Sequence, residues 1–200
     1  MSCNDYSHVR INLVRKQKFW SSKVTLYFIG SMRTVTVEDC SDCTFVFSSV
    51  SSLVQISSCS GCTFIFASRC VHLQNLTSCT VHLATPLRPY LSGQNENLIL
   101  GPYHICYKSL ESDLNRAGLR PSPNLWNKPF QIEKTEKNCW ELMHPKDFFY
   151  YVMPFDLDKE KFRKRFAFPL EAQYADAITQ KEEIHKLSKA KIKVKIFRKF

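Results

Sequence analysis

The sequence lacks the long apolar run that a membrane span requires. No stretch of its 200 residues approaches the roughly 20 consecutive apolar residues of a spanning helix. Residues 1–20 are polar, basic and aromatic, which is not the pattern of a secretion signal. We therefore expect a cytoplasmic protein. Its nine cysteines, an odd number without an export signal, favour reduced thiols over disulfides.

Glycine is also scarce, with five residues in the whole chain. A glycine-rich loop that cradles phosphate groups is hard to build from so few. We find no Ser/His/Asp arrangement and no paired-carboxylate site either. We therefore expect no cofactor and none of the common catalytic centres.

Acidic residues are missing from the end of the chain. The net charge is +10, and residues 186–200 contain no carboxylate. Three structures are possible for this end of the chain. Alternation of lysine with Ile or Val over 191–196 suits an amphipathic strand, whereas 186–191 could instead prolong the preceding helix. The third possibility is a solvated end without fixed structure. Contact with an acidic protein or anionic lipid is predicted, and nucleic acid is disfavoured because no base-stacking platform accompanies the charge. The cations of this basic tail are Lys186, Lys189, Lys191, Lys193, Lys195, Arg198 and Lys199.

A five-residue pattern recurs through the first half of the chain. Cys-Thr-Phe-Val-Phe at 43–47 returns 19 residues later at 62–66 and, altered, 17 residues after that at 79–83, with further copies at 24–28 and 96–100. A second triplet keeps the same spacing at 35–37, 54–56 and 71–73. Apolar residues alternate within each copy, as in strands with one buried face. No helical stretch separates the strands, which excludes a βαβ fold.

Units of 17–19 residues made of short strands and tight corners predict a mainly β protein, a right-handed parallel β-helix. Corners are expected at Asp39, at 48–49 and 51–52, and at 60–61, where Ser, Asp and Gly gather. Successive coils then stack at about 4.8 Å. Two inward stacks are predicted: Leu26, Phe45, Phe64, Val81 and Leu98, beside Phe28, Phe47, Phe66, Leu83 and Leu100.

Four cysteines have the spacing of a zinc ribbon. Cys40-x-x-Cys43 and Cys59-x-x-Cys62 lie fifteen residues apart, as zinc ligands often do. The repeat offers a competing explanation, because the two pairs occupy equivalent positions one coil apart. We favour a ladder of thiols and no metal, with zinc as the alternative.

The second half of the domain carries the more specific motifs. They are Gly101-Pro102-Tyr103, then Leu110-Glu111, Leu114 and Ala117-Gly118-Leu119, then Asn124-x-Trp126 and Pro129, preceded by Thr85-Pro86-x-Arg88-Pro89 and Leu91-Ser92-Gly93. With the repeats, they make the chain resemble the tubulin-binding cofactor C (C-CAP) domain family. Phe148–Phe155 and the segment from Tyr174 to Glu183 resemble its domain-containing protein 1 branch.

The resemblance implies a known activity that this chain departs from. Members of the family stimulate GTP hydrolysis by tubulin or Arl-type small GTPases through an arginine finger in a Gln-x-Arg triplet. That triplet falls here on Cys70-Val71-His72, and histidine cannot present the planar fork of a guanidinium. Arg69 and Arg88 are possible substitutes. We therefore expect a non-catalytic protein with a binding surface at Arg69, His72, Gln74 and Arg88.

The resemblance further implies a scaffold or adaptor of the microtubule-organising centre (centrosome, basal body or spindle pole) that supports organelle positioning and cell morphogenesis. Its expected partners are tubulin, centrosomal proteins or an Arl-type GTPase, and its expected location is the cytoskeleton. The alternative function is a GTPase-activating protein for tubulin or an Arl-type GTPase.

We expect four parts along the chain. Residues 1–22 cap the open end of the coil with apolar residues that include Val9, Ile11, Phe19 and Trp20. Residues 23–132 form the β-helix domain. A helix at Glu111–Arg116, which ends at Gly118, closes this domain. Residues 133–168 form a docking segment rich in aromatic residues, and 169–200 a helix, with Pro169 in its first turn, and the basic tail. The apolar stripe of that helix is Leu170, Tyr174, Ala177, Ile178, Ile184 and Leu187.

Overall fold

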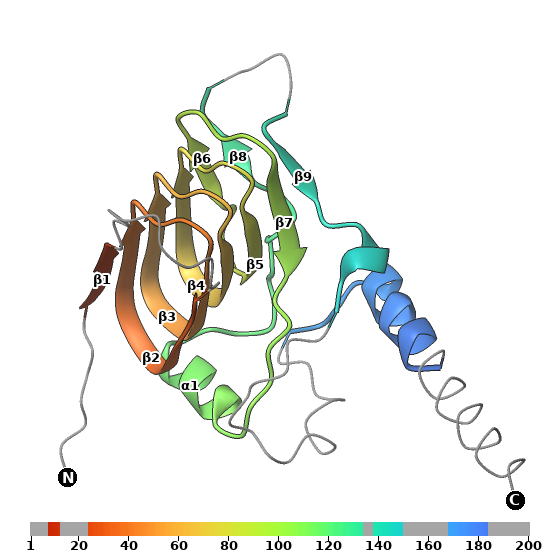
Figure 1. Ribbon diagram of the computed structural model, residues 1–200. Helices are drawn as coiled ribbons and strands as arrows, with labels where there is room; N and C mark the ends of the chain where they lie inside the picture. The colour runs from red at the N-terminus through yellow and green to blue at the C-terminus, as the bar shows by residue number, and fades with distance from the viewer. Residues whose placement is uncertain (1–7, 13–23, 134–137, 150–167, 184–200) are drawn as a thin grey trace, which may run out of the picture.

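A parallel β-solenoid forms the body of the protein, as the repeats predict (Figure 1). The computed structural model describes residues 8–12, 24–133, 138–149 and 168–183. Strands β2 (Val24–Glu38), β3 (Cys43–Ser57) and β4 (Thr63–Gln74) each run along two sides of the coil. In the later coils each side has its own strand: β5 (Thr80–Ala84) and β6 (Tyr90–Ser92), then β7 (Leu98–Pro102) and β8 (Phe130–Gln131).

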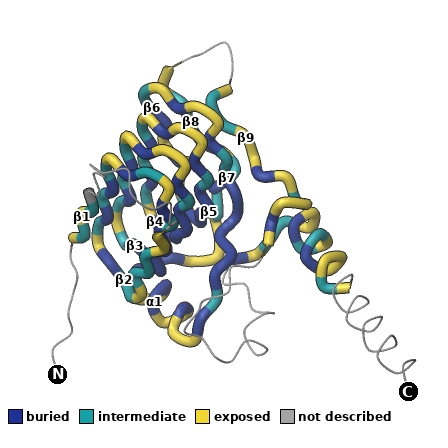
Figure 2. Tube along the Cα trace, in the orientation of Figure 1, coloured by how far each residue is buried: buried dark blue, intermediate teal, exposed yellow. Residues whose placement is uncertain are grey.

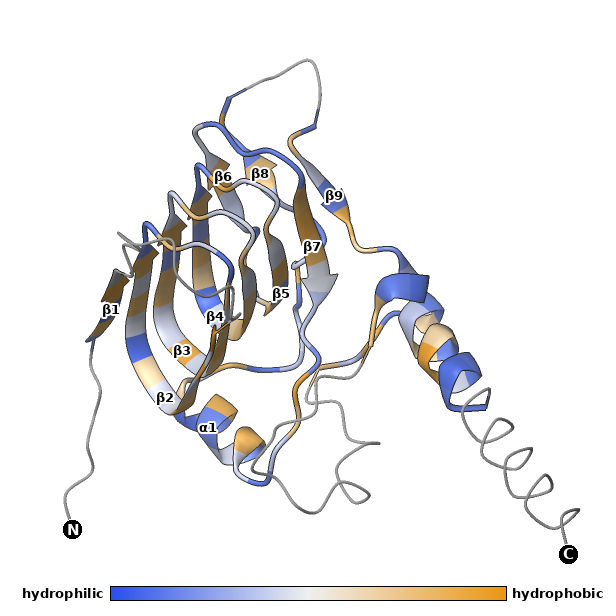
Figure 3. Ribbon diagram, in the orientation of Figure 1, coloured by the Kyte–Doolittle hydropathy of each residue, from blue (hydrophilic) through white to orange (hydrophobic). Residues whose placement is uncertain are grey.

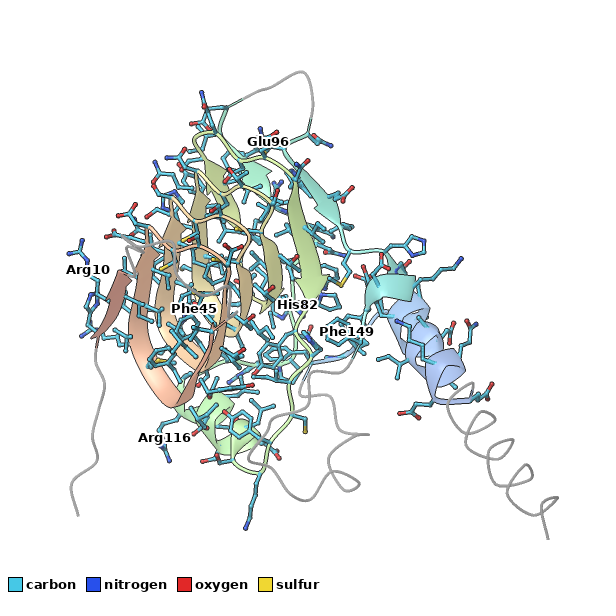
Figure 4. All side chains as sticks on the ribbon, in the orientation of Figure 1. Arg10, Phe45, His82, Glu96, Arg116 and Phe149 are labelled. Atoms are coloured by element: carbon cyan, nitrogen blue, oxygen red, sulfur yellow. The ribbon has the colours of Figure 1, made fainter. Side chains whose placement is uncertain are left out.

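The stacking register confirms the repeat over the first coils. Leu26 pairs with Phe45 and Phe45 with Phe64, while Val35 pairs with Val54 and Val54 with Val71. The rings of Phe45 and Phe64 stack with centroids 5.2 Å apart, inside the coil where Figure 4 labels Phe45. Figure 2 shows buried positions that recur along successive strands, and Figure 3 shows apolar residues that recur along these strands.

The predicted register of the last coil is wrong by two residues. Val81 pairs with Leu100, and Leu83 with Pro102, instead of the expected partners Leu98 and Leu100. The spacing between these coils is therefore 19, as in the bridge between Thr77 and Glu96, and not 17. The short copy at 96–100 matched equally well in either register, because its apolar residues alternate with period two.

The corners differ in kind from each other. Ser48 and Ser49, and likewise 51–52, lie within β3, where the pairing shifts register, so these expected corners are bulges that bend a continuous strand. Two other corners per coil use left-handed backbone, at Asp39 (φ 53°) and Asp42 (φ 53°) and at their equivalents one coil on, Ser58 (φ 54°) and Gly61 (φ 62°). Short polar residues and glycine tolerate that conformation best.

The cysteines form ladders inside the coil. Ser41 bridges to Ser60 and Ser60 to Thr77, so Cys40 and Cys59 occupy equivalent positions, as do Cys43, Cys62 and Cys79. All five are buried, and each thiol donates a hydrogen bond to the carbonyl oxygen two residues earlier, at 3.2–3.4 Å. Hydrogen bonding to Cys62, together with burial, raises the pKa of Cys59 and Cys79.

One outer side of the coil is covered by the segment that follows β7. Helix α1 (Leu110–Arg116) packs on β2 and β3, and Gly118 (φ 67°) ends it as predicted. Buried Asp113 of α1 accepts hydrogen bonds from the Tyr107 hydroxyl at 2.8 Å and the Ser48 hydroxyl at 3.5 Å. These contacts hold α1 against the bulge of β3.

The proline-rich segment then returns along the coil. The Leu125 amide donates to the Thr85 carbonyl at 2.7 Å and the Phe130 amide to the Pro89 carbonyl at 2.7 Å. β8 pairs in parallel with β6, and β9 (Trp140–Leu142) pairs with β7. These strands extend the last coil on two sides.

A helix over 172–183 lies beyond β9 and the 3₁₀ turn η1 (Pro145–Asp147). Its apolar stripe is confirmed where described: Tyr174 and Ile178 are buried and Leu170 packs against the core. The Tyr174 hydroxyl donates to the Met143 carbonyl at 2.7 Å. Pro169 precedes the helix, so the prediction that it lies in the first turn is wrong. Ile184 and Leu187 lie outside the described residues. Among those described, no helix is long and apolar enough to cross a membrane.

At the other end, β1 (His8–Asn12) pairs in parallel with the second half of β2, and Val9 and Ile11 pack against the core. Because β1 takes up hydrogen bonds of β2, it covers part of the edge of the sheet. Phe19 and Trp20 of the predicted cap lie outside the described residues.

Candidate functional site

Two outward ladders of the solenoid differ in exposure. The first runs through Val46, Ile65 and His82 and is buried beneath the segment that contains α1. The second runs from Thr36 through Gln55, His72 and Tyr90 to Phe130. We define the open face as this second ladder together with Gln74 and Ile132.

His72 lies in the middle of the open face, half-buried between two neighbours. Its Nε2 is 2.7 Å from the Ser92 hydroxyl, and its ring meets the edge of Tyr90 with centroids 5.1 Å apart. These contacts hold the imidazole against the sheet, and an imidazole lacks the planar fork of donors of a guanidinium.

Arg69, the first possible substitute for the finger, lies at the corner of β4 that faces the end of α1. It is exposed, and a Cβ built on Gly118 would lie 3.5 Å from its Nη2. Its guanidinium therefore extends toward the loop after α1, while His72 extends from the open face. The two side chains leave β4 on different sides.

Arg88, the second substitute, is engaged within the fold. Its Nε donates to the Lys128 carbonyl at 2.9 Å and its Nη2 to the Pro129 carbonyl at 3.0 Å, while the guanidinium lies 5.5 Å from the Phe130 ring centroid. These contacts fix the start of β8. Arg88 positions the aromatic end of the open face, and its two hydrogen bonds would have to break before it could reach a phosphate.

Gln74 is half-buried and belongs to the ladder beside that of His72, where it pairs with Ser57 and Ser92. It therefore lies two residues along β4 from His72 and on the same face. The structure thus brings together His72 and Gln74 with Arg88 nearby, and it directs Arg69 elsewhere. The predicted basic tail, 186–200, lies outside the described residues.

Sequence reasoning missed the aromatic part of the open face. Tyr90 is 40% exposed, Phe130 47% and Ile132 43%, and the rings of Tyr90 and Phe130 stack with centroids 6.1 Å apart. The sequence signal was weak, because these residues are far apart in the chain and only the pairing of β6 with β8 joins them. Leu87, at the neighbouring corner, is 51% exposed.

The described residues contain no group of three or more His, Cys, Asp or Glu arranged to hold a metal ion. The four candidate zinc ligands are instead buried in the ladders described above.

The chain can be compared with known proteins at this point. The family model described as "Tubulin binding cofactor C" matches residues 15–132. "TBCC domain-containing protein 1" of Xenopus tropicalis is 33% identical over 135 residues, 66% of this chain and 25% of the relative. The protein of that name from Homo sapiens is 26% identical over 160 residues, 79% of this chain and 28% of the relative.

The chain therefore spans about a quarter of the length of these relatives. A coil register that follows the repeats, a closing helix ended by Gly118 and a returning proline-rich segment accompany the match over 15–132. The chain belongs to the tubulin-binding cofactor C family.

Proposed function

We propose that this protein is a non-catalytic binding module whose open face docks a protein partner. The observation that carries the proposal is the exposed aromatic end of that face, Tyr90 and Phe130 at 40% and 47% exposure. Partly exposed aromatic residues on a rigid sheet are typical centres of protein–protein interfaces. Arg88 supports the same end of the face from beneath.

The environment of the expected finger position also supports a binding role. A finger needs a mobile guanidinium that can enter a nucleotide site. His72 is held by Ser92, Arg88 is held by two backbone carbonyls, and Arg69 points toward Gly118. None of these three side chains is arranged as a finger on the open face.

The partner and the location follow from the family by analogy. The relatives are named for their domain and not for an activity, so the role of scaffold or adaptor at the microtubule-organising centre is our inference for this chain. Tubulin, centrosomal proteins and an Arl-type GTPase are its candidate partners, and organelle positioning and cell morphogenesis are the processes we expect it to support.

The test is binding of the full chain to tubulin and to GTP-loaded Arl-type GTPases, with the variant Tyr90→Ser/Phe130→Ser. We expect at least a tenfold loss of affinity for the true partner, since each aromatic anchor contributes about 1–2 kcal/mol. The matched control is Ile29→Ser, an equally exposed apolar residue (40%) on β2. Equal affinities for both variants would contradict the open face as the docking surface.

GTPase activation is the second candidate, favoured by the exposure of Arg69. A single-turnover GTPase assay separates the two functions. We expect no stimulation by the wild-type chain; stimulation that disappears in Arg69→Ala and persists in Arg88→Ala would establish an arginine finger, and with it an enzyme.

A further inference from the structure

A hollow in the surface lies away from the open face, where β9 meets η1 and the C-terminal helix. Its volume is about 400 Å³. Ile99, Leu142, Met143 and Tyr174 supply apolar surface, while Glu141 and Asp147 supply carboxylates. We call it the β9 groove. Figure 1 shows β9 at the end of the coil with the C-terminal helix beyond it.

The groove combines an apolar floor with negative charge. Leu142 is 42% exposed there, although it pairs with Leu100 and continues an inward row of the solenoid. The residues that line the groove include two carboxylates and neither Lys nor Arg. A ligand for it needs apolar side chains on one face and cations beside them.

The groove also borders an unpaired sheet edge. β9 pairs with β7 on one side, and among the residues that the structure describes no strand pairs with its other side. Backbone N–H and C=O groups of such an edge accept an added strand. The groove is therefore suited to an extended peptide.

The chain itself contains a segment of this chemistry. Over 191–196 lysine alternates with Ile192, Val194 and Ile196, so an extended conformation puts cations on one face and apolar side chains on the other. The residues from 186 to the end include seven cations and no carboxylate. The charge and the period both complement the β9 groove.

The distance also permits the contact. Tyr174 lines the groove, and nine helical residues from there to 183 rise about 14 Å. Residues 184–190 can span about 23 Å when extended, which is more than the return requires. A short tether of this kind gives an effective concentration on the order of millimolar. The tail therefore occupies the groove if the dissociation constant of the contact is below that concentration.

We infer that the β9 groove binds the basic segment 186–200 of the same chain, with 191–196 lying along the free edge of β9. This contact brings the lysines to Glu141 and Asp147 and covers Leu142. It makes the tail a bound element in the isolated protein, and any acidic partner of the tail has to compete with the groove. The inference stands independently of the open face.

The experiment is zero-length carbodiimide cross-linking of the full chain, followed by mass spectrometry. We expect amide links from Glu141 and Asp147 to Lys191, Lys193 or Lys195, at least five times as frequent as links from Glu111, an exposed carboxylate on α1. The variant Leu142→Ser, which keeps both carboxylates, should reduce the links from Asp147 several-fold. Its matched control, Leu87→Ser, changes an exposed leucine (51%) elsewhere and should leave them unchanged.

A mixture of ¹⁵N-labelled and unlabelled chains identifies the origin of the segment. Links within one isotopic chain support the inference, whereas mixed-isotope links in the statistical proportion would overturn it in favour of a second copy. Links spread equally over Glu111 and the groove carboxylates would overturn it as well. Should Leu142→Ser unfold, as circular dichroism would show, Glu141→Lys replaces it, and unchanged Asp147 links in that variant would contradict the docking.

Discussion

His82 and His104 lie in contact beneath the covered side of the coil. Their ring centroids are 4.0 Å apart, both residues are 2% exposed, and Phe148 closes over them. Burial lowers the pKa of His82 to about 4 and that of His104 well below its usual value. Both imidazoles are therefore neutral in the folded protein at pH 7.

This pair predicts that stability falls as the solution becomes acidic. In the unfolded chain these two histidines bind protons below a pKa of about 6.5, whereas in the folded chain burial keeps them neutral to a lower pH. The free energy of unfolding therefore has its full value above pH 6.5. It falls by about 1.4 kcal/mol per pH unit for each histidine as the pH falls toward 4. Urea unfolding between pH 7 and pH 4.5 measures it. A flat profile would contradict the neutral pair.

Gly101 is constrained by the same pair. A Cβ built on it would lie 2.9 Å from the His82 Nδ1 and 3.2 Å from the Met143 Sδ. Because the His82 ring is buried against His104 and Phe148, we expect Gly101→Ala to lower the free energy of unfolding by about 1–3 kcal/mol. Gly30→Ala, where no atom lies within 4 Å but the φ is +121°, tests backbone strain alone. Equal thermal stability of Gly101→Ala and the wild type would refute the close packing.

The cysteine ladders carry a prediction about metal content. Buried thiols that donate to local carbonyls behave as small apolar residues. We expect protein purified without added zinc to contain far less than one equivalent in elemental analysis, and Cys40→Ala/Cys59→Ala to retain the fold. One equivalent of tightly held zinc would restore the zinc-ribbon interpretation.

At the scale of elements, the C-terminal helix is attached to the coil through Tyr174. Its ring packs on Trp126 and Phe148 with centroids 5.8 Å and 5.3 Å away, and its hydroxyl donates to the Met143 carbonyl. The helix is held as well by buried Ile178 and by Lys181, whose Nζ donates to the Phe148 carbonyl at 2.7 Å.

Tyr174→Phe isolates the hydrogen bond from the packing. It leaves a buried carbonyl without its donor, which costs about 1–2 kcal/mol. Hydrogen exchange of the amides in 172–183 should accelerate several-fold, while the amides of β3 keep their rates. Thr179→Ala, which removes an exposed hydroxyl bonded within the helix, is the control. Faster exchange in that control alone would show that the helix is limited by its own stability and not by Tyr174.

At the scale of the whole molecule, charge and fold are separated along the chain. The coil core is apolar, whereas seven cations gather in 186–200. We predict that deletion of 186–200 changes the thermal midpoint by less than about 2 °C, since the core keeps its burial. Co-sedimentation with microtubules in low salt should weaken several-fold. Co-sedimentation at the wild-type level would exclude the tail as the contact with acidic tubulin.

Much of the solenoid was predictable because each coil repeats its inward residues. Phe45 and Phe64 recur at a fixed spacing, and period-two alternation assigns them to one face. The final register was not predictable in the same way. Leu98 and Leu100 are interchangeable in an alternating pattern, and only the pairing of β5 with β7 in the folded protein distinguishes them.

The site was predictable only in part. His72 follows from the position of the family triplet, but the roles of Arg69 and Arg88 depend on directions that a sequence does not contain. Arg88 donates to the Lys128 and Pro129 carbonyls, which are 40 and 41 residues away in the chain. Tyr90 and Phe130 become neighbours through the same long-range pairing.

The stacking of the first coils and the cysteine ladders were determined by the sequence alone, because local spacing is sufficient to stack equivalent residues. Which outer side is buried was decided by the tertiary structure. His82 and His72 occupy similar outward positions on their strands, yet α1 and the segment after β7 cover the first and leave the second open. Non-local packing of that kind depends on where a distant segment returns, and this is why the open face and the β9 groove emerge only in the folded protein.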